Sequence, residues 1–108
     1  MTEADLEKFR SNASGLPRST TVFHEAGLRT LLLHLKAGEK IPQHQTRGAI
    51  VVHCVGGRGS FSVAGEQTEL REGVLISVAA SVPHALAANE HEELLVLVMI
   101  SEPAADQQ

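Results

Sequence analysis

The sequence contains no tyrosine and no tryptophan, and only three of its 108 residues are phenylalanine. Sites that bind carbohydrate or stack nucleobases usually depend on aromatic side chains, so this scarcity argues against both classes. It also removes the tyrosine phenol from the possible catalytic acids. The net charge of −4 lacks the positive patch that nucleic-acid binding needs, and we expect no nucleic-acid partner.

Long apolar runs and paired cysteines are missing as well. The longest runs, LLLHL and ELLVLVMI, fall far short of the roughly 18 residues that a membrane-spanning helix needs, so we expect no membrane partner. The single cysteine, Cys54, cannot form an internal disulfide, which makes a reducing, cytoplasmic location the expectation. The remaining composition, with 43% hydrophobic residues, is that of one ordinary globular domain.

Short runs of Val, Ile, Leu and Thr, separated by Gly-containing turns, begin near Thr20. This spacing predicts an all-β fold, an antiparallel jelly-roll β-barrel over residues 18–102. Residues 1–17 are predicted to form an N-terminal arm that can hold a short helix over 2–10, capped by Thr2 with Asp5 three residues later. Residues 103–108 are predicted to be a solvated tail. Strands are expected near 20–25, 28–36, 42–46, 50–56, 59–64, 67–71, 74–78, 84–89 and 93–101.

Three of these segments, RTLLLHLK, AIVVHCV and ELLVLVMI, are apolar on both faces. In an isolated barrel one face of each strand meets water, so we expect something to cover the outer face of one sheet. The simplest cover is a second copy of the chain, which predicts a homodimer. Val51, His53 and Val55 should lie on the covered face.

Two histidines occur in a spaced pattern of glycines. In the stretch GEKIPQHQTRGAIVVHCVGG, five residues separate Gly38 from His44, Thr46 follows two places later, and Ile50 and Gly57 complete the pattern. These spaced glycines and His44 form the first of two motifs in the chain, and the second lies closer to the C-terminus.

The second motif begins at Gly73, and VPHALAAN carries His84. Together the two motifs resemble those of the cupin superfamily, specifically the small, RmlC-like, single-domain bacterial cupins. Ala79 and Ser81 stand where the family has Pro and Gly, and Asn89 sits one place late. The resemblance covers roughly residues 20–101 and implies a cupin barrel.

In the family, three histidines and one glutamate converge on a divalent metal such as Fe, Mn, Ni or Zn. Only His44 and His84 keep these positions, because Thr46 and Ile50 replace the other two ligands. Two imidazoles fall short of the three protein ligands that catalytic zinc sites use. We therefore expect no metal cofactor. If a metal is bound, His44 and His84 should hold it, with His34 or Cys54 as candidates for a further ligand.

The resemblance and the strand parity together predict a small pocket in which His44, Thr46 and His84 are polar groups on an aliphatic wall. Ala88 belongs to this wall, and Cys54 shares the parity of Ile50 but is expected to be inert packing. His53 has the opposite parity and should face away, while His24 and His91 lie near turns and should be solvated. The predicted ligand-binding residues are His44, Thr46, Ile50, Val52, Cys54, His84 and Leu86.

Three functions fit this pattern. The first is a metal-free barrel that binds a small metabolite, with anions among the candidates. The second is a metal-dependent cupin enzyme of dioxygenase or isomerase type with an atypical ligand set. The third is an accessory or regulatory barrel that acts through its dimer surface. A simpler alternative for His44 and His84 is that both are only hydrogen-bonded packing residues. Ile50 favours the first interpretation over the second, because an aliphatic side chain cannot balance a metal's charge.

Overall fold

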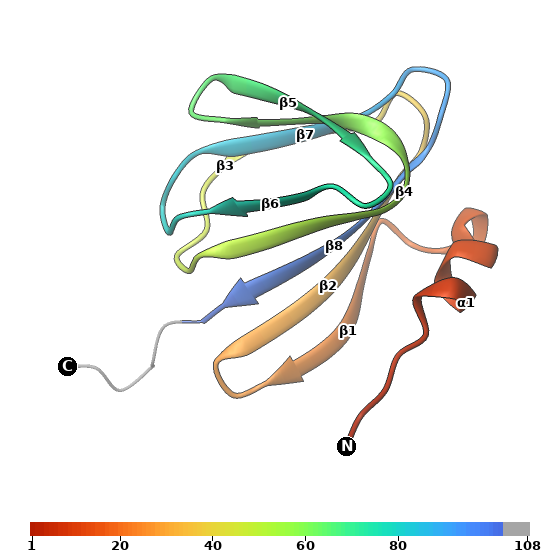
Figure 1. The fold of residues 1–108 in the computed structure, drawn as a ribbon, viewed down its shortest axis with the longest axis horizontal. Helices are drawn as coiled ribbons and strands as arrows, with labels where there is room; N and C mark the ends of the chain where they lie inside the picture. The colour runs from red at the N-terminus through yellow and green to blue at the C-terminus, as the bar shows by residue number, and fades with distance from the viewer. Residues whose placement is uncertain (103–108) are drawn as a thin grey trace.

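The structure is a computed structural model that describes residues 1–102, and within this range β-strands are the main secondary structure, with one short helix (Figure 1). The predicted tail, 103–108, lies outside the described residues. The all-β prediction is confirmed. The elements are α1 (Leu6–Ser11), η1 (Ala13–Gly15), β1 (Ser19–Glu25), β2 (Leu28–Leu35), β3 (Lys40–His44), β4 (Ile50–Val63), β5 (Glu66–Arg71), β6 (Leu75–Val78), β7 (His84–Ala88) and β8 (Leu94–Ser101).

All the strand pairings are antiparallel, and they form one sheet that curls into two layers. The first layer has the order β1-β2-β8-β4-β6, and the second has the order β3-β7-β4-β5. Strand β4 belongs to both, because residues 50–57 pair in the first layer and residues 58–63 pair in the second. Figure 1 shows β4 curving between the layers at the end of the molecule next to α1. This arrangement is the predicted jelly roll.

The continuity of β4 differs from the prediction of two separate strands over 50–56 and 59–64. A bulge between Cys54 and Gly56 shifts the register against β8, and Gly57 follows with a φ of 81°. A Cβ atom on Gly57 would overlap the carbonyl oxygen of Glu93 on the approach to β8. The glycines therefore bend the strand and let it pass close to its neighbour instead of ending it.

The prediction for β3 is also wrong by two residues, since the strand covers Lys40–His44 and not 42–46. β3 lies at the edge of its layer and pairs only with β7 among the described strands. Pro42 is tolerated there because an edge strand does not need every backbone N–H for the ladder. As a result, Thr46 lies in the loop after the strand.

The interior of the barrel is filled by one apolar cluster from both layers. Along β2 and β8, alternate residues point inward, such as Leu35 and Val96, while residues of the opposite parity, such as Leu32 and Leu95, point outward. The inward cluster contains Leu35, Ile50, Val52, Cys54, Phe61, Leu70, Val78, Leu86, Ala88, Leu94, Val96, Val98 and Ile100. The segments that are apolar on both faces therefore supply two separate apolar surfaces.

The N-terminal arm covers part of the outer surface. Leu6, Phe9 and Leu16 pack against a cluster that contains Leu32 and Val55. The arm therefore covers Val55, one of the three residues expected on a covered outer face, and the homodimer stays a prediction.

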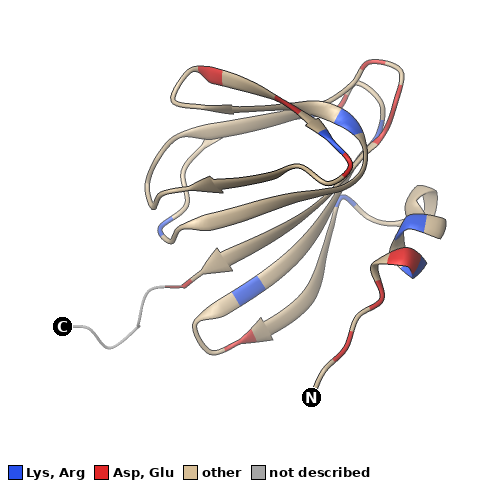
Figure 2. Cartoon of the chain, viewed as in Figure 1, with Lys and Arg blue, Asp and Glu red and all other residues tan. Residues whose placement is uncertain are grey.

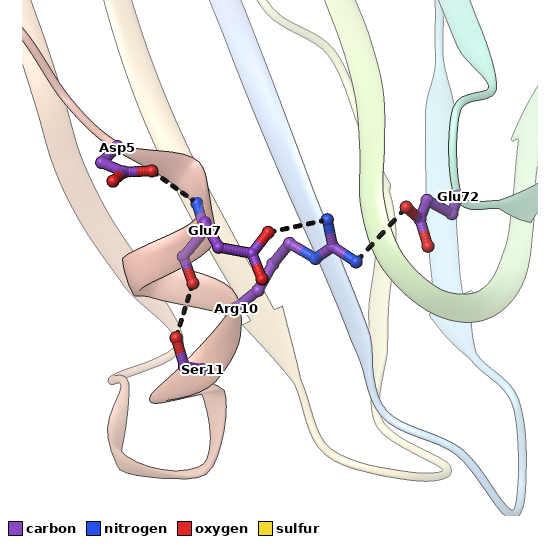
Figure 3. A network of polar contacts seen from close by, with 5 residues as sticks. All are labelled: Asp5, Glu7, Arg10, Ser11 and Glu72. Carbon is purple, nitrogen blue, oxygen red and sulfur yellow. Dashed lines mark hydrogen bonds and ion pairs between the residues drawn. The ribbon is translucent and has the colours of Figure 1, made fainter.

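Helix α1 begins later than predicted. Asp5, not Thr2, is the N-cap, and its carboxylate accepts a hydrogen bond of 3.0 Å from the Glu7 backbone N–H. Aspartate caps at least as well as threonine, and the helix starts where Leu6 and Phe9 can pack on the sheet. Arg10 then links the helix to the barrel, with contacts of 3.2 Å to Glu7 and 3.3 Å to Glu72 (Figure 3).

Charged residues are concentrated at turns, strand ends and the helix, and most of the strand ribbon carries none (Figure 2). No helix in residues 1–102 has the length and apolar character needed to cross a membrane.

Candidate functional site

A pocket of about 180 Å³ opens inside the barrel. Its wall is aliphatic except for His44, Thr46 and His84 and the ring of Phe61, and no charged residue lines it. The lining residues are Leu31, Leu33, Ile41, His44, Thr46, Ile50, Val52, Phe61, His84, Leu86, Val98 and Ile100. An apolar wall with a few converging polar groups is the usual composition of a small-molecule site.

The two histidines of the motifs are neighbours in this pocket. His44 ends β3 and pairs directly with His84, the first residue of β7. Their ring centroids are 4.4 Å apart with an interplanar angle of 64°, and the Phe61 ring stacks on that of His84 with a centroid distance of 5.8 Å and an interplanar angle of 9°. His84 is only 3% exposed, whereas His44 is exposed, so His44 marks the mouth of the pocket and His84 its interior.

Each imidazole is oriented by a backbone carbonyl two residues earlier in the chain. The Nδ1 atom of His44 lies 3.0 Å from the carbonyl oxygen of Pro42, and that of His84 lies 3.0 Å from the carbonyl oxygen of Val82. No residue of the described chain forms a hydrogen bond with Nε2 of either ring. The second nitrogen of each ring is therefore available to a ligand.

Thr46 is held by the two loops at this end of the barrel. Its hydroxyl donates a hydrogen bond of 2.9 Å to the Gly48 carbonyl, and its own carbonyl accepts one of 2.8 Å from the Ser81 N–H. Ser81 has a φ of 66°, a left-handed conformation that glycine adopts more easily. This is the position at which the cupin motif has glycine, so the backbone shape is kept although the residue is not.

The donor set does not fit the metal site that the motif resemblance implies. In residues 1–102, no three His, Cys, Asp or Glu side chains come together as a metal would require. Ile50 is 3% exposed in the core and has no donor atom, and Thr46 offers only a neutral hydroxyl oxygen, which is a weak ligand. Two imidazoles are fewer than the three protein ligands of a catalytic zinc site, and neither brings negative charge.

The two candidates for a further metal ligand, His34 and Cys54, both lie outside the pocket. His34 is 4% exposed on the outward side of β2, where its Nε2 contacts the Glu93 carboxylate at 2.7 Å. Cys54 faces inward as the parity predicted, but it is fully buried in the core and does not line the pocket. Burial raises the pKa of the Cys54 thiol, and a smaller effect of hydrogen bonding with the Gly56 backbone lowers it. The thiol therefore stays protonated and inert at neutral pH.

Of the seven predicted ligand-binding residues, only Cys54 is missing from the lining of the pocket. Ala88, expected on the same wall, lies in the core cluster and lines a different surface depression. His53 faces outward, where it pairs with Leu75 and Leu97. His24 and His91 are exposed, as predicted.

Six lining residues were not predicted: Leu31, Leu33, Ile41, Phe61, Val98 and Ile100. A signal existed for Phe61, because the alternation in SFSV places it on one face opposite two serines. For the residues of β2 and β8 there was none, because both strands are apolar on both faces.

Comparison with known proteins agrees with this fold. A conserved protein of unknown function from Streptococcus pyogenes superimposes with a TM-score of 0.68 at 27% identity, covering 80% of this chain and 75% of that one. A cupin protein from Bacteroides fragilis gives 0.70 at 19% identity, with coverages of 86% and 85%. The DMSP lyase DddQ from Ruegeria pomeroyi gives 0.72 at 18% identity, with coverages of 81% and 47%.

No curated protein resembles the chain closely enough in sequence to count as a relative. The family model for the cupin domain matches residues 31–101, which include every strand from the middle of β2 to the end of β8. The chain therefore belongs to the cupin domain family.

Proposed function

We propose that this cupin binds a small molecule in the barrel pocket and does so without a transition metal. The observation that supports the proposal most strongly is that the rings of His44 and His84, with centroids 4.4 Å apart, lie together in an otherwise apolar pocket. The His84 side chain is 3% exposed, and no residue in 1–102 hydrogen-bonds its Nε2, so this nitrogen can bond to a ligand in the pocket.

The alternative function is a metal-dependent enzyme of dioxygenase or isomerase type. It would need a third ligand, and the nearest candidates from the sequence, His34 and Cys54, are both outside the pocket. Ile50 fills the position at which the motif supplies a carboxylate, so a divalent ion would remain without a balancing charge. These features favour the metal-free function.

The proposal is tested by identifying what the purified protein carries. Native mass spectrometry of the parent is expected to show a bound small molecule that is released on denaturation. Val98→Phe should lose that molecule, because Val98 lines the pocket and a phenyl ring would occupy it. Leu28→Phe is the matched control, because Leu28 is 45% exposed at the start of β2 and does not line the pocket. Equal retention in both variants, or a molecule held only through a metal ion, would contradict the proposal.

We also propose that the partner of the outer face is a second copy of the chain. The arm covers only one end of this face, and Val51 and Leu75 beyond it are 37% and 65% exposed. Met99 pairs with Val51, and His53 pairs with Leu75, so these side chains form a continuous strip across β8, β4 and β6. The uncharged strip suits a symmetric contact in which the same residues of the two copies meet.

A cytoplasmic location for the protein remains a prediction.

A further inference from the structure

The backbone determines which hydrogen-bonding groups the pocket offers. A carbonyl oxygen can only accept a hydrogen bond, so Nδ1 must carry the proton in both His44 and His84. In a neutral imidazole the other nitrogen, Nε2, then holds a lone pair and can only accept. Because the contacts to Pro42 and Val82 are both 3.0 Å, the same tautomer is fixed in both rings.

The third polar group has the same character. The hydroxyl of Thr46 donates its only proton to the Gly48 carbonyl at 2.9 Å. Its remaining capacity is to accept. The three polar side chains of the pocket lining thus present acceptors, and none has a free proton to donate while the imidazoles are neutral.

The geometry points to the chemical class of the ligand. We propose that the pocket selects a neutral molecule with an apolar body and a hydroxyl donor at one end, in preference to a hydrocarbon of the same shape or to an anion. The inference rests on the proposed binding function and narrows it. A hydroxyl can donate to the Nε2 lone pair of His84, which has no hydrogen-bond partner within residues 1–102. A carboxylate would face acceptors only, in a pocket without a cation.

The size of the pocket limits the apolar body. An apolar cavity of about 150 Å³ is known to hold benzene, and this pocket measures about 180 Å³. A six-membered ring with one small substituent therefore matches the volume. The ring would lie against the aliphatic side chains, among them Val52, Leu86 and Val98, with its hydroxyl turned toward the two histidines.

The test compares three probes of nearly equal size at neutral pH: phenol, toluene and benzoate. Long-range ¹H–¹⁵N spectra of the imidazoles should show the Nδ1–H tautomer in both rings and a shift of Nε2 when phenol is added. Titrations should show phenol binding about two- to twelvefold more tightly than toluene, the effect of one hydrogen bond, and benzoate binding more weakly than phenol.

Two variants assign the effect to the histidines. His44→Phe, at the exposed mouth, should fold and should reduce the preference for phenol over toluene. His91→Phe, exposed and outside the pocket, should leave the preference unchanged. Toluene binding as tightly as phenol, benzoate binding more tightly, or the opposite tautomer would overturn the inference while leaving the binding function intact. Failure of all three probes to bind would overturn the inference, and the binding function would fall with it only if native mass spectrometry of the parent also shows no bound molecule.

Discussion

Rebuilding the missing metal ligands is the most informative perturbation of this barrel. Thr46 and Ile50 occupy the two positions at which the cupin motif supplies a histidine and a glutamate, and both line the same pocket as His44 and His84. The double substitution Thr46→His with Ile50→Glu should therefore create a four-ligand site of three imidazoles and one carboxylate. Such a set suits Zn²⁺ or Ni²⁺.

Without metal the double variant should be markedly less stable than the parent. Ile50 is 3% exposed, and burying such a side chain contributes about 1.5–3 kcal/mol. An unpaired carboxyl group in the same place costs about 1–3 kcal/mol more, and loss of the bond from Thr46 to Gly48 costs about 1 kcal/mol. The free energy of unfolding should thus fall by about 3.5–7 kcal/mol.

Metal binding should restore much of the lost free energy of unfolding, because the ion binds only the folded state. At a free concentration of one hundred times Kd the gain is about 2.7 kcal/mol, which raises Tm by roughly 10 °C or more in a domain of this size. Thermal melting followed by circular dichroism, with and without Zn²⁺ or Ni²⁺, measures both effects.

A matched control separates ligation from general destabilisation. Thr46→Asn with Ile50→Gln introduces polar groups of similar size without a third imidazole or a charge. It should lose stability and should not regain it with metal. The reasoning is refuted if the control is rescued as well as the ligand-bearing variant, or if the parent itself gains comparable stability from Zn²⁺.

Three further outcomes follow from the fold. Burial raises the pKa of the Cys54 thiol above its ordinary value of 9.0, so the stability of the parent relative to Cys54→Ala should be constant at neutral pH and fall as pH rises past 9.0, as measured by urea unfolding. Gly57→Ala should cost about 2 kcal/mol or more, because its φ is 81° and the Cβ meets backbone, whereas Gly56→Ala, with open space around it, should cost less than about 1 kcal/mol in the same assay. Val51→Lys should convert a dimer of twice 11.5 kDa into a monomer by light scattering, and a parent that is already monomeric would contradict the proposed contact.

The sequence was sufficient to predict the fold and the centre of the pocket. Motif spacing placed His44 and His84 in register, and antiparallel pairing of β3 with β7 then brings the rings together. Strand parity correctly predicted that Ile50 and Cys54 face inward and that His53 faces outward. These features depend on periodicity, which is local and visible in a single sequence.

Features that depend on three-dimensional closure could not be predicted in the same way. Cys54 has the right parity, but it lies near the bend of β4, where the core is packed and the pocket does not reach. The face of His34 was ambiguous because β2 is apolar on both sides, and only pairing with β8 fixes it outward beside Glu93. The cover provided by the arm depends on where Phe9 packs, which no local pattern encodes.

The tautomers of the two histidines could not be predicted from the sequence either. They follow from the carbonyls of Pro42 and Val82, each two residues before its histidine. Composition identifies the imidazoles as polar groups, but only the backbone conformation shows that both offer acceptors to the pocket.

The metal content of the parent protein tests the central claim most directly. Elemental analysis of protein purified without added metal should find far less than one transition metal per chain, because His44 and His84 bring no negative charge and no third His, Cys, Asp or Glu of residues 1–102 joins them. Stoichiometric metal that is lost in His44→Ala or His84→Ala would contradict the claim and establish this pocket as a metal centre.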